Sequence, residues 1–406
     1  MWVFLVAILV LNAIILWRCR KLKDGKFLII IWLIAFGLRL AGTILFNVYI
    51  YEGQYEHPDS SHWDNNAIRK ISKLGQGNIQ DLSSPNYPLI IGIIYAIFGQ
   101  HNLIPSFFNI SLSSWTIVLL YTLAARIFSQ KVARITAILA TVHPGLIYWP
   151  IQHLKEAYIL FLLALTFFTF IPKEKKYEFS NLVWASIITG LIYFSRFKIA
   201  LIASATLLFG SLILQSRKKL SSIAFASIIF FWIFVLAFSS YQSILEEKIS
   251  ILPKDLLTDT LATLNKATTR SSTVESHRRF FDENLAPLKI DTIKDVAASF
   301  PKGMFRFFTY PFPWKAKNGF EIVFGIYITW WYILLPFVAY GIWLSIKEKN
   351  RKAWIPLAFA AQTSIGLGMI VNAVGPLIRW REMAFTFLLM FGAKGIWEII
   401  RKNRRK

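Results

Sequence analysis

Residues 27–50 read FLIIIWLIAFGLRLAGTILFNVYI, an apolar run in which Arg39 is the one charged residue. A helix of about 20 apolar residues crosses the hydrocarbon core of a bilayer, so this run is long enough to span a membrane. Its apolar residues are continuous, whereas the strands of a membrane barrel alternate apolar and polar residues. The run therefore predicts a membrane-spanning helix.

Similar runs recur along the whole chain. Its residues are 55% hydrophobic and 17% charged, against about 45–50% and about 25% in soluble domains. We expect an all-α, polytopic membrane helical bundle of about 11 spans, with amphipathic helices in external loops. The expected spans are 2–17, 27–50, 103–126, 132–150, 157–172, 180–195, 197–215, 220–241, 320–345, 353–372 and 378–399. Residues 2–17 are predicted to be a retained span and not a cleaved signal peptide.

Basic residues gather in short loops between these runs. The formal net charge of +23 could indicate a nucleic-acid partner, but positive charge in short loops is typical of the cytoplasmic side of a membrane protein. The loops are 18–26, 126–134, 173–176, 217–219, 347–352 and 401–406. With these loops inside, residues 52–86 and 242–319 are predicted to lie outside and the C-terminus inside. The single cysteine, Cys19, lies in the first of these loops, which excludes an intramolecular disulfide.

This pattern predicts three parts. Residues 1–241 form an N-terminal transmembrane core with an external loop at 52–86, and residues 320–406 form C-terminal helices with a basic cytoplasmic tail. Between them, residues 242–319 alternate apolar and polar residues and end in an aromatic, basic stretch. We expect amphipathic helices at the membrane surface there; the alternative is an ordinary external loop with an aromatic cluster.

Two carboxylates stand out by their position at the external ends of spans. Asp59 follows the exit of span 27–50, and Glu156 begins span 157–172, directly after Lys155. An acid at a helix start also interacts well with the helix dipole or caps the helix, so each has a purely structural alternative. Asp64 is a competing candidate for the first acid.

Basic residues at external span ends go against the cytoplasmic preference of positive charge. They are Arg196, Lys198, Arg379 and Arg381. A phosphate-bearing lipid at the outer surface would compensate them, because arginine binds phosphate oxygens bidentately. Local pairing, such as Arg381 with Glu382, or contact with lipid headgroups is the alternative.

The external loop and the segments after it carry a family resemblance. The residues concerned are Asp59, Ser60, Trp63, Ala67 and Gly75, followed by Pro85–Pro88, Phe98–Gly99, Asn109, His143–Pro144, Glu156 and Arg379–Arg381. Their order resembles that of the GT-C superfamily of integral-membrane glycosyltransferases. The most similar group uses dolichyl- or polyprenyl-phosphate sugars and includes protein mannosyltransferases and lipid A aminoarabinose transferases.

The resemblance implies transfer of a sugar from a polyprenyl phosphate to an acceptor hydroxyl of a glycan, lipid or protein, with inversion. Asp59 would be the base, Glu156 would position acceptor or sugar, and the external basic residues would bind the donor phosphate. The expected acceptor or sugar contacts are His62, Trp63, His153 and Lys155. His57, His62 and His153 with Asp59 match no standard set of metal ligands, so we expect neither a metal nor a cofactor.

Two alternatives remain open. A surface-polysaccharide polymerase or ligase would also have large external loops. A transporter would place ionisable groups or broken helices near the bilayer midplane, often in a duplicated pattern; here the polar residues lie at span ends and no repeat is visible. The expected location is a bacterial inner or plasma membrane, with the active site on the extracytoplasmic side.

Overall fold

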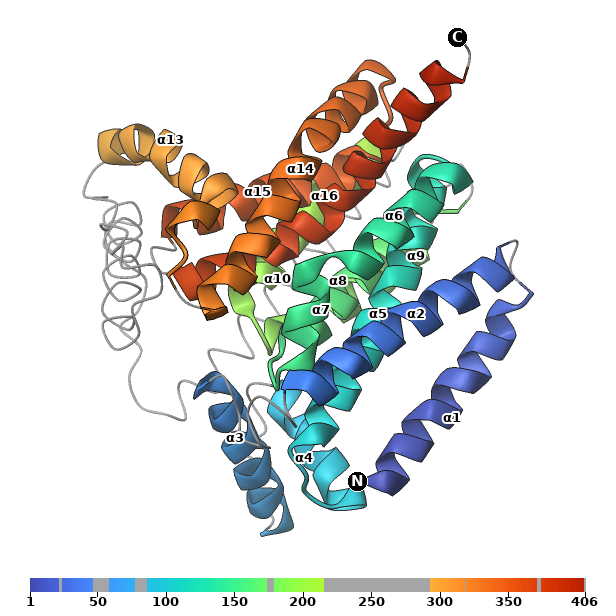
Figure 1. Ribbon diagram of the computed structural model, residues 1–406, viewed down its shortest axis with the longest axis vertical. Helices are drawn as coiled ribbons and strands as arrows, with labels where there is room; N and C mark the ends of the chain where they lie inside the picture. The colour runs from blue at the N-terminus through green and yellow to red at the C-terminus, as the bar shows by residue number, and fades with distance from the viewer. Residues whose placement is uncertain are drawn as a thin grey trace. The chain divides into compact units, whose positions relative to one another are not determined.

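The computed structural model describes residues 1–21, 24–46, 58–76, 86–173, 179–214, 293–317, 319–370 and 374–404. Of these residues, 88% are helical and none is in a strand (Figure 1), which confirms the all-α class. The predicted span 220–241, the loop 217–219 and most of the region 242–319 lie outside the described residues.

The chain divides into two compact units. Unit 1 comprises residues 1–228 together with 350–353 and 396–406, and unit 2 comprises 229–349 together with 354–395. The described helices of unit 1 include α3 (Pro58–Gly75) and α4 (Asn86–Phe98) in addition to the apolar helices given below.

Six of the described helices are long and apolar enough to cross a membrane. They are α1 (Trp2–Cys19), α2 (Gly25–Thr43), α5 (Leu103–Ile127), α10 (Phe197–Leu214), α14 (Gly319–Lys347) and α16 (Val374–Asn403). The protein is thus an integral membrane protein, although the count of about 11 spans is not confirmed. Three predicted spans are shorter helices, namely α8 (Glu156–Phe170), α9 (Phe179–Tyr193) and α15 (Trp354–Ile370).

The predicted span 132–150 is interrupted by a bend. This stretch forms α6 (Gln130–Val142) and α7 (Pro144–Ile151), which are bent by 49° at His143. Proline lacks a backbone N–H and forces the preceding residue into an extended conformation. His143 accordingly has φ −65° and ψ 120°, and Pro150 removes a second donor within α7.

Helix α5 carries polar side chains on the face that meets α7. Ser113 Oγ donates to the carbonyl of Leu146 at 3.1 Å. That carbonyl lies four residues before Pro150, which has no N–H to give it. Ser106 Oγ donates to the carbonyl of Ile151 at 2.9 Å. Side chains of α5 thus supply the donors that the proline-containing helix lacks.

The predicted cytoplasmic loops of unit 1 meet one another through hydrogen bonds. Arg134 forms a bidentate pair with Asp24 at 3.0 and 2.7 Å. Arg126 donates to the carbonyls of Phe168 and Ile171 at 2.5 and 2.8 Å. Lys352 donates to Pro172 O at 2.8 Å and Asn350 to Ile127 O at 2.7 Å. The segments around 24, 126–134, 168–172 and 350–352 therefore share one end of unit 1; which side of the membrane this end faces stays a prediction.

In unit 2, helices approach closely at glycines. A Cβ at Gly341 of α14 would lie 1.9 Å from the carbonyl oxygen of Phe391, and one at Gly395 of α16 would lie 2.2 Å from that of Phe337. Small residues that allow backbones to touch are typical of helix pairs in membranes. Helix α13 (Ile293–Thr309) packs on α15 in the same unit.

Glycine is also essential where α3 crosses α4. A Cβ on Gly92 would lie 2.7 Å from the backbone oxygen of Ala67. We expect Gly92→Ala to lower stability by about 1–3 kcal/mol, because the helix backbones must separate. Gly37→Ala in α2 is the matched control, since a Cβ there meets nothing within 4 Å. Thermal unfolding in detergent measures both variants. An equal melting temperature for Gly92→Ala and the wild type would show that the close crossing is wrong.

Candidate functional site

Helix α3 has one buried face. Ser60, Asp64, Ala67 and Lys70 recur at helical spacing and are 0, 8, 0 and 5% exposed. Asp59 is half-buried in the first turn of this helix, where a carboxylate interacts well with the helix dipole. Trp63 lies four residues after Asp59, so the two share a second face beside the buried one.

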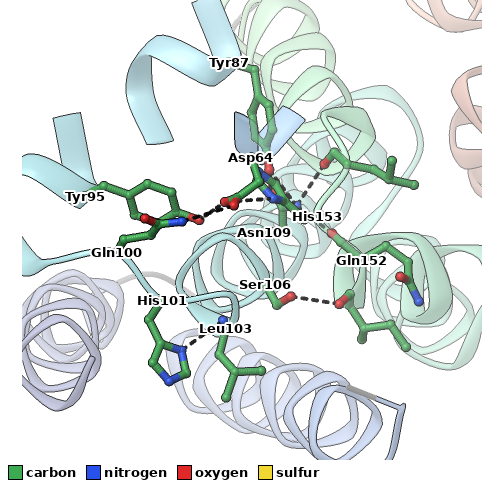
Figure 2. A network of polar contacts seen from close by, with 12 residues as sticks. Asp64, Tyr87, Tyr95, Gln100, His101, Leu103, Ser106, Asn109, Gln152 and His153 are labelled. Atoms are coloured by element: carbon green, nitrogen blue, oxygen red, sulfur yellow. Dashed lines mark hydrogen bonds and ion pairs between the residues drawn. The ribbon is translucent and has the colours of Figure 1, made fainter. Parts of the chain in front are cut away.

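Asp64 is the centre of a polar network (Figure 2). Tyr95 Oη on α4 donates to Asp64 Oδ1 at 2.5 Å, and Gln100 Nε2 donates to Oδ2 at 3.4 Å. His153 Nδ1 lies 3.8 Å from Oδ1 on the other side. Asp64, the competing candidate in the sequence, therefore accepts hydrogen bonds from two neighbouring side chains.

His153 lies in the connection between α7 and α8, where it is 1% exposed. Burial lowers the pKa of His153 from 6.5 to about 3, so the imidazole is neutral at neutral pH. Its approach to Asp64 is consequently a contact between a neutral ring and a carboxylate, and not an ion pair. The ring of Tyr87 lies 5.8 Å from that of His153.

Asn109 of α5 holds this connection in place. Its side-chain amide donates to the carbonyls of Gln152 at 3.0 Å and Leu154 at 2.8 Å, and its Oδ1 accepts from Tyr87 Oη at 3.4 Å. Asn109 is fully buried. The same face of α5 that serves α7 therefore also orients the residues leading to Glu156.

Glu156 and Arg196 form a buried ion pair. Arg196 Nη2 donates to Glu156 Oε1 at 2.5 Å, and the two side chains are 11% and 1% exposed respectively. The predicted second acid and one predicted phosphate-binding residue therefore lie together. The pair joins the start of α8 to the connection between α9 and α10.

Lys155 connects this pair to α3. Its Nζ donates to the carbonyl of Ser195 at 2.8 Å and lies 4.4 Å from the ring centroid of Trp63. Ser195 Oγ in turn donates to Asn86 Oδ1 at the start of α4. One end of unit 1 thus gathers Trp63, Lys155 and the pair Glu156–Arg196, which the sequence separates widely.

The other predicted site residues lie as follows. His62 is exposed and has Nε2 2.8 Å from Asn66 Nδ2. Lys198 is exposed near the start of α10. Arg379 and Arg381 lie on α16 and belong to unit 2. The functional roles of all these residues stay predictions.

Arg381 is fully buried. It donates to the carbonyls of Phe307, at 3.2 Å, and Tyr310, and lies 5.0 Å from the ring centroid of Tyr327. In this conformation its guanidinium supports the end of α13. Across the described residues, no group of three or more His, Cys, Asp or Glu side chains could hold a metal ion.

The sequence interpretation missed Tyr95, Gln100 and Asn86 as partners of the site. The spacing of Ser60, Asp64 and Ala67 is a signal that could have placed Asp64 on the buried face of α3. Tyr95 and Gln100 carry no comparable signal, because their relevance depends on how α4 packs against α3.

Residues 83–241 match the family of dolichyl-phosphate-mannose-protein mannosyltransferases. That family is of the GT-C type, so the resemblance is confirmed over this segment. The match covers less than half of the chain. It includes Asn109, His153, Glu156 and Arg196 and begins after α3, which carries Asp59 and Asp64. No curated protein matches the chain.

The buried His153 predicts a pH-dependent stability. An unfolded histidine has a pKa of about 6.5, and the folded value is about 3. The unfolded state therefore binds the proton more readily, and the stabilising contribution of neutral His153 is present above about pH 6.5 and is lost as the pH falls towards about 3. When the pH is lowered from about 7.5 to about 5, we expect the melting temperature of His153→Gln to fall less than that of the wild type.

The exposed His62 offers the control for this measurement, since His62→Gln removes a histidine from the same region. Because His62→Gln keeps His153, this variant should retain the loss of melting temperature that protonation of His153 causes. An identical profile for His153→Gln and the wild type would contradict the burial of a neutral imidazole at position 153.

Proposed function

We propose that this protein transfers a sugar from a polyprenyl-phosphate donor to an acceptor hydroxyl. The family match supports a membrane glycosyltransferase with such a donor. The observation that carries the proposal is the cluster of Trp63, Lys155, Glu156 and Arg196 at one end of a set of apolar helices. A lipid-linked substrate needs such an arrangement, because its isoprenoid chain stays in the bilayer while its sugar phosphate is polar.

Asp59 is the proposed base. A polyprenyl phosphate is already a good leaving group, so the reaction depends on activating the acceptor hydroxyl and on stabilising the phosphate. The carboxylate of Asp64 accepts hydrogen bonds from Tyr95 and Gln100, which occupy both of its oxygens. Asp59 is half-buried and shares a helix face with Trp63, which contacts Lys155. A single displacement would invert the anomeric carbon.

Arg196 is the proposed phosphate-binding residue of unit 1. Its ion pair with Glu156 holds the guanidinium in one orientation, and a planar guanidinium fits phosphate oxygens. Lys198 follows on the exposed start of α10. In unit 2, Arg379 and Arg381 are proposed to contact the phosphate of the sugar donor. Glu156 would then act mainly by orienting Arg196.

The sugar or acceptor is proposed to contact the face of Trp63, with His62 and Lys155 beside it. An aromatic ring presents a flat apolar surface that suits the C–H face of a sugar, and the Lys155 ammonium lies over this ring. His153 is buried and would support this surface through Asp64. We place this end of unit 1 on the extracytoplasmic side, because the basic loops lie together at an end formed by other segments.

Asp59→Asn tests the proposed base. Incubation of the purified protein with a panel of polyprenyl-phosphate sugars and acceptors should release polyprenyl phosphate. We expect Asp59→Asn to lower this rate by about 10²–10⁴-fold, the usual contribution of a general base. The fold should be retained, because the lost interaction with the helix dipole costs only about 0.3–1 kcal/mol. Asn65→Ala, at an exposed position of the same helix, should retain the wild-type rate. Full activity of Asp59→Asn would rule out the assignment.

A further inference from the structure

Helix α3 contacts the rest of unit 1 through its backbone and through several side chains. Ala67 meets α4 at Gly92, Trp63 meets Lys155, and Asp64 meets Tyr95, Gln100 and His153. The close crossing at Gly92 sets the separation of the two helices. The hydrogen bonds of Asp64 also fix the rotation of α3 about its own axis, because hydrogen bonds form only over a narrow range of angles.

We propose that Asp64 is a positioning residue of the sugar-transfer site, which acts with Tyr95 to fix the rotation of α3. This inference rests on the proposed function. Through the fixed rotation, the face with Asp59 and Trp63 is directed towards Lys155 and the Glu156–Arg196 pair.

The geometry of a helix makes this link direct. Successive residues are rotated by about 100°, so Asp59 and Trp63 differ by about 40° around the axis, and Asp64 lies about 100° from Trp63. A rotation that breaks the contacts of Asp64 therefore also moves Asp59 and Trp63. The three partners of Asp64 come from α4, from the α4–α5 connection and from the α7–α8 connection, which are all parts of unit 1.

The environment of Asp64 strengthens its contacts. The side chain is 11% exposed and its neighbour His153 is 0% exposed. Hydrogen bonds to a charged group are stronger than those between neutral groups, and they gain further in surroundings of low dielectric constant. Figure 2 shows the carboxylate of Asp64 lying between Tyr95 and Gln100 on one side and His153 on the other.

Tyr95→Phe removes one donor and leaves the ring that packs in the interior. A misplacement of about 1 Å can cost about 10²-fold in rate, so we expect kcat for sugar transfer to fall by about tenfold or more. The KM for the donor should stay within about twofold, because no donor contact is removed. Tyr121→Phe is the matched control, since Tyr121 Oη donates to Asp24 at the other end of unit 1. Its kcat should equal that of the wild type.

Substitutions of Asp64 separate positioning from proton transfer. Asp64→Asn keeps an acceptor for Tyr95, so it should retain much more activity than Asp64→Ala. A residue that took the proton itself would lose activity equally in both variants. Equal and complete loss in Asp64→Asn and Asp64→Ala, with unchanged folding, would overturn the positioning role.

A distance measurement tests the rotation of α3 without any substrate. Spin labels at the exposed positions 69 on α3 and 183 on α9, in a Cys19→Ser background, report the placement of α3 within unit 1. We expect Tyr95→Phe to broaden or shift the distance distribution and Tyr121→Phe to leave it unchanged. An unchanged distribution for Tyr95→Phe would overturn the proposal, as would a changed distribution with an unchanged kcat.

The two failures are distinguishable. If the wild-type protein turns over none of the polyprenyl-phosphate sugars, the proposed function fails, and with it the role of Asp64 in transfer. The distance measurement then still decides whether Asp64 and Tyr95 hold α3. If the wild-type protein is active but Tyr95→Phe matches it in kcat, only the inference about Asp64 fails.

Discussion

The constraint on which the rest of unit 1 depends is the need to satisfy backbone carbonyls where prolines interrupt a membrane helix. In hydrocarbon no water is present to take their place, so an irregular backbone needs donors from the protein. Pro144 and Pro150 break and weaken the stretch 130–151. Ser106, Asn109 and Ser113 on α5 donate to the carbonyls that follow the break. These contacts explain why a helix as apolar as α5 carries buried polar residues on one face.

The same contacts place the residues that we assign to the reaction. Asn109 fixes the carbonyls of Gln152 and Leu154, and the chain then continues directly to Lys155 and Glu156. Those two side chains meet Ser195 and Arg196, so the α9–α10 connection is positioned in turn. The broken helix is followed by a short, largely buried connection, residues 152–155, which hydrogen bonds from Asn109 hold in place. Helix α3 joins this arrangement through Asp64 and Trp63.

The sequence predicted the helical class and the membrane setting, because these follow from hydrophobic run length and from charge. It did not predict the bend, although Pro144 and Pro150 were visible, since the apolar run is continuous across them. The pairing of Glu156 with Arg196 depends on packing between α8 and α9, which no local pattern encodes. The sequence favoured Asp59 over the competing Asp64 but did not predict their different burial, which follows from the face that α3 turns towards α4. The burial of Arg381 likewise depends on α13, a helix distant in the chain.

The most direct measurement of this account is hydrogen exchange in peptides covering residues 150–156 of Asn109→Leu. Each buried carbonyl left without its donor costs about 1–3 kcal/mol, and about 1.4 kcal/mol corresponds to a factor of ten in an equilibrium. We predict that these amides exchange about tenfold or more faster than in the wild type. Thr116→Val, whose hydroxyl bonds only within α5 to Leu112 O in the described contacts, should leave them unchanged. Wild-type exchange of residues 150–156 in Asn109→Leu would contradict the claim that α5 holds the site in place.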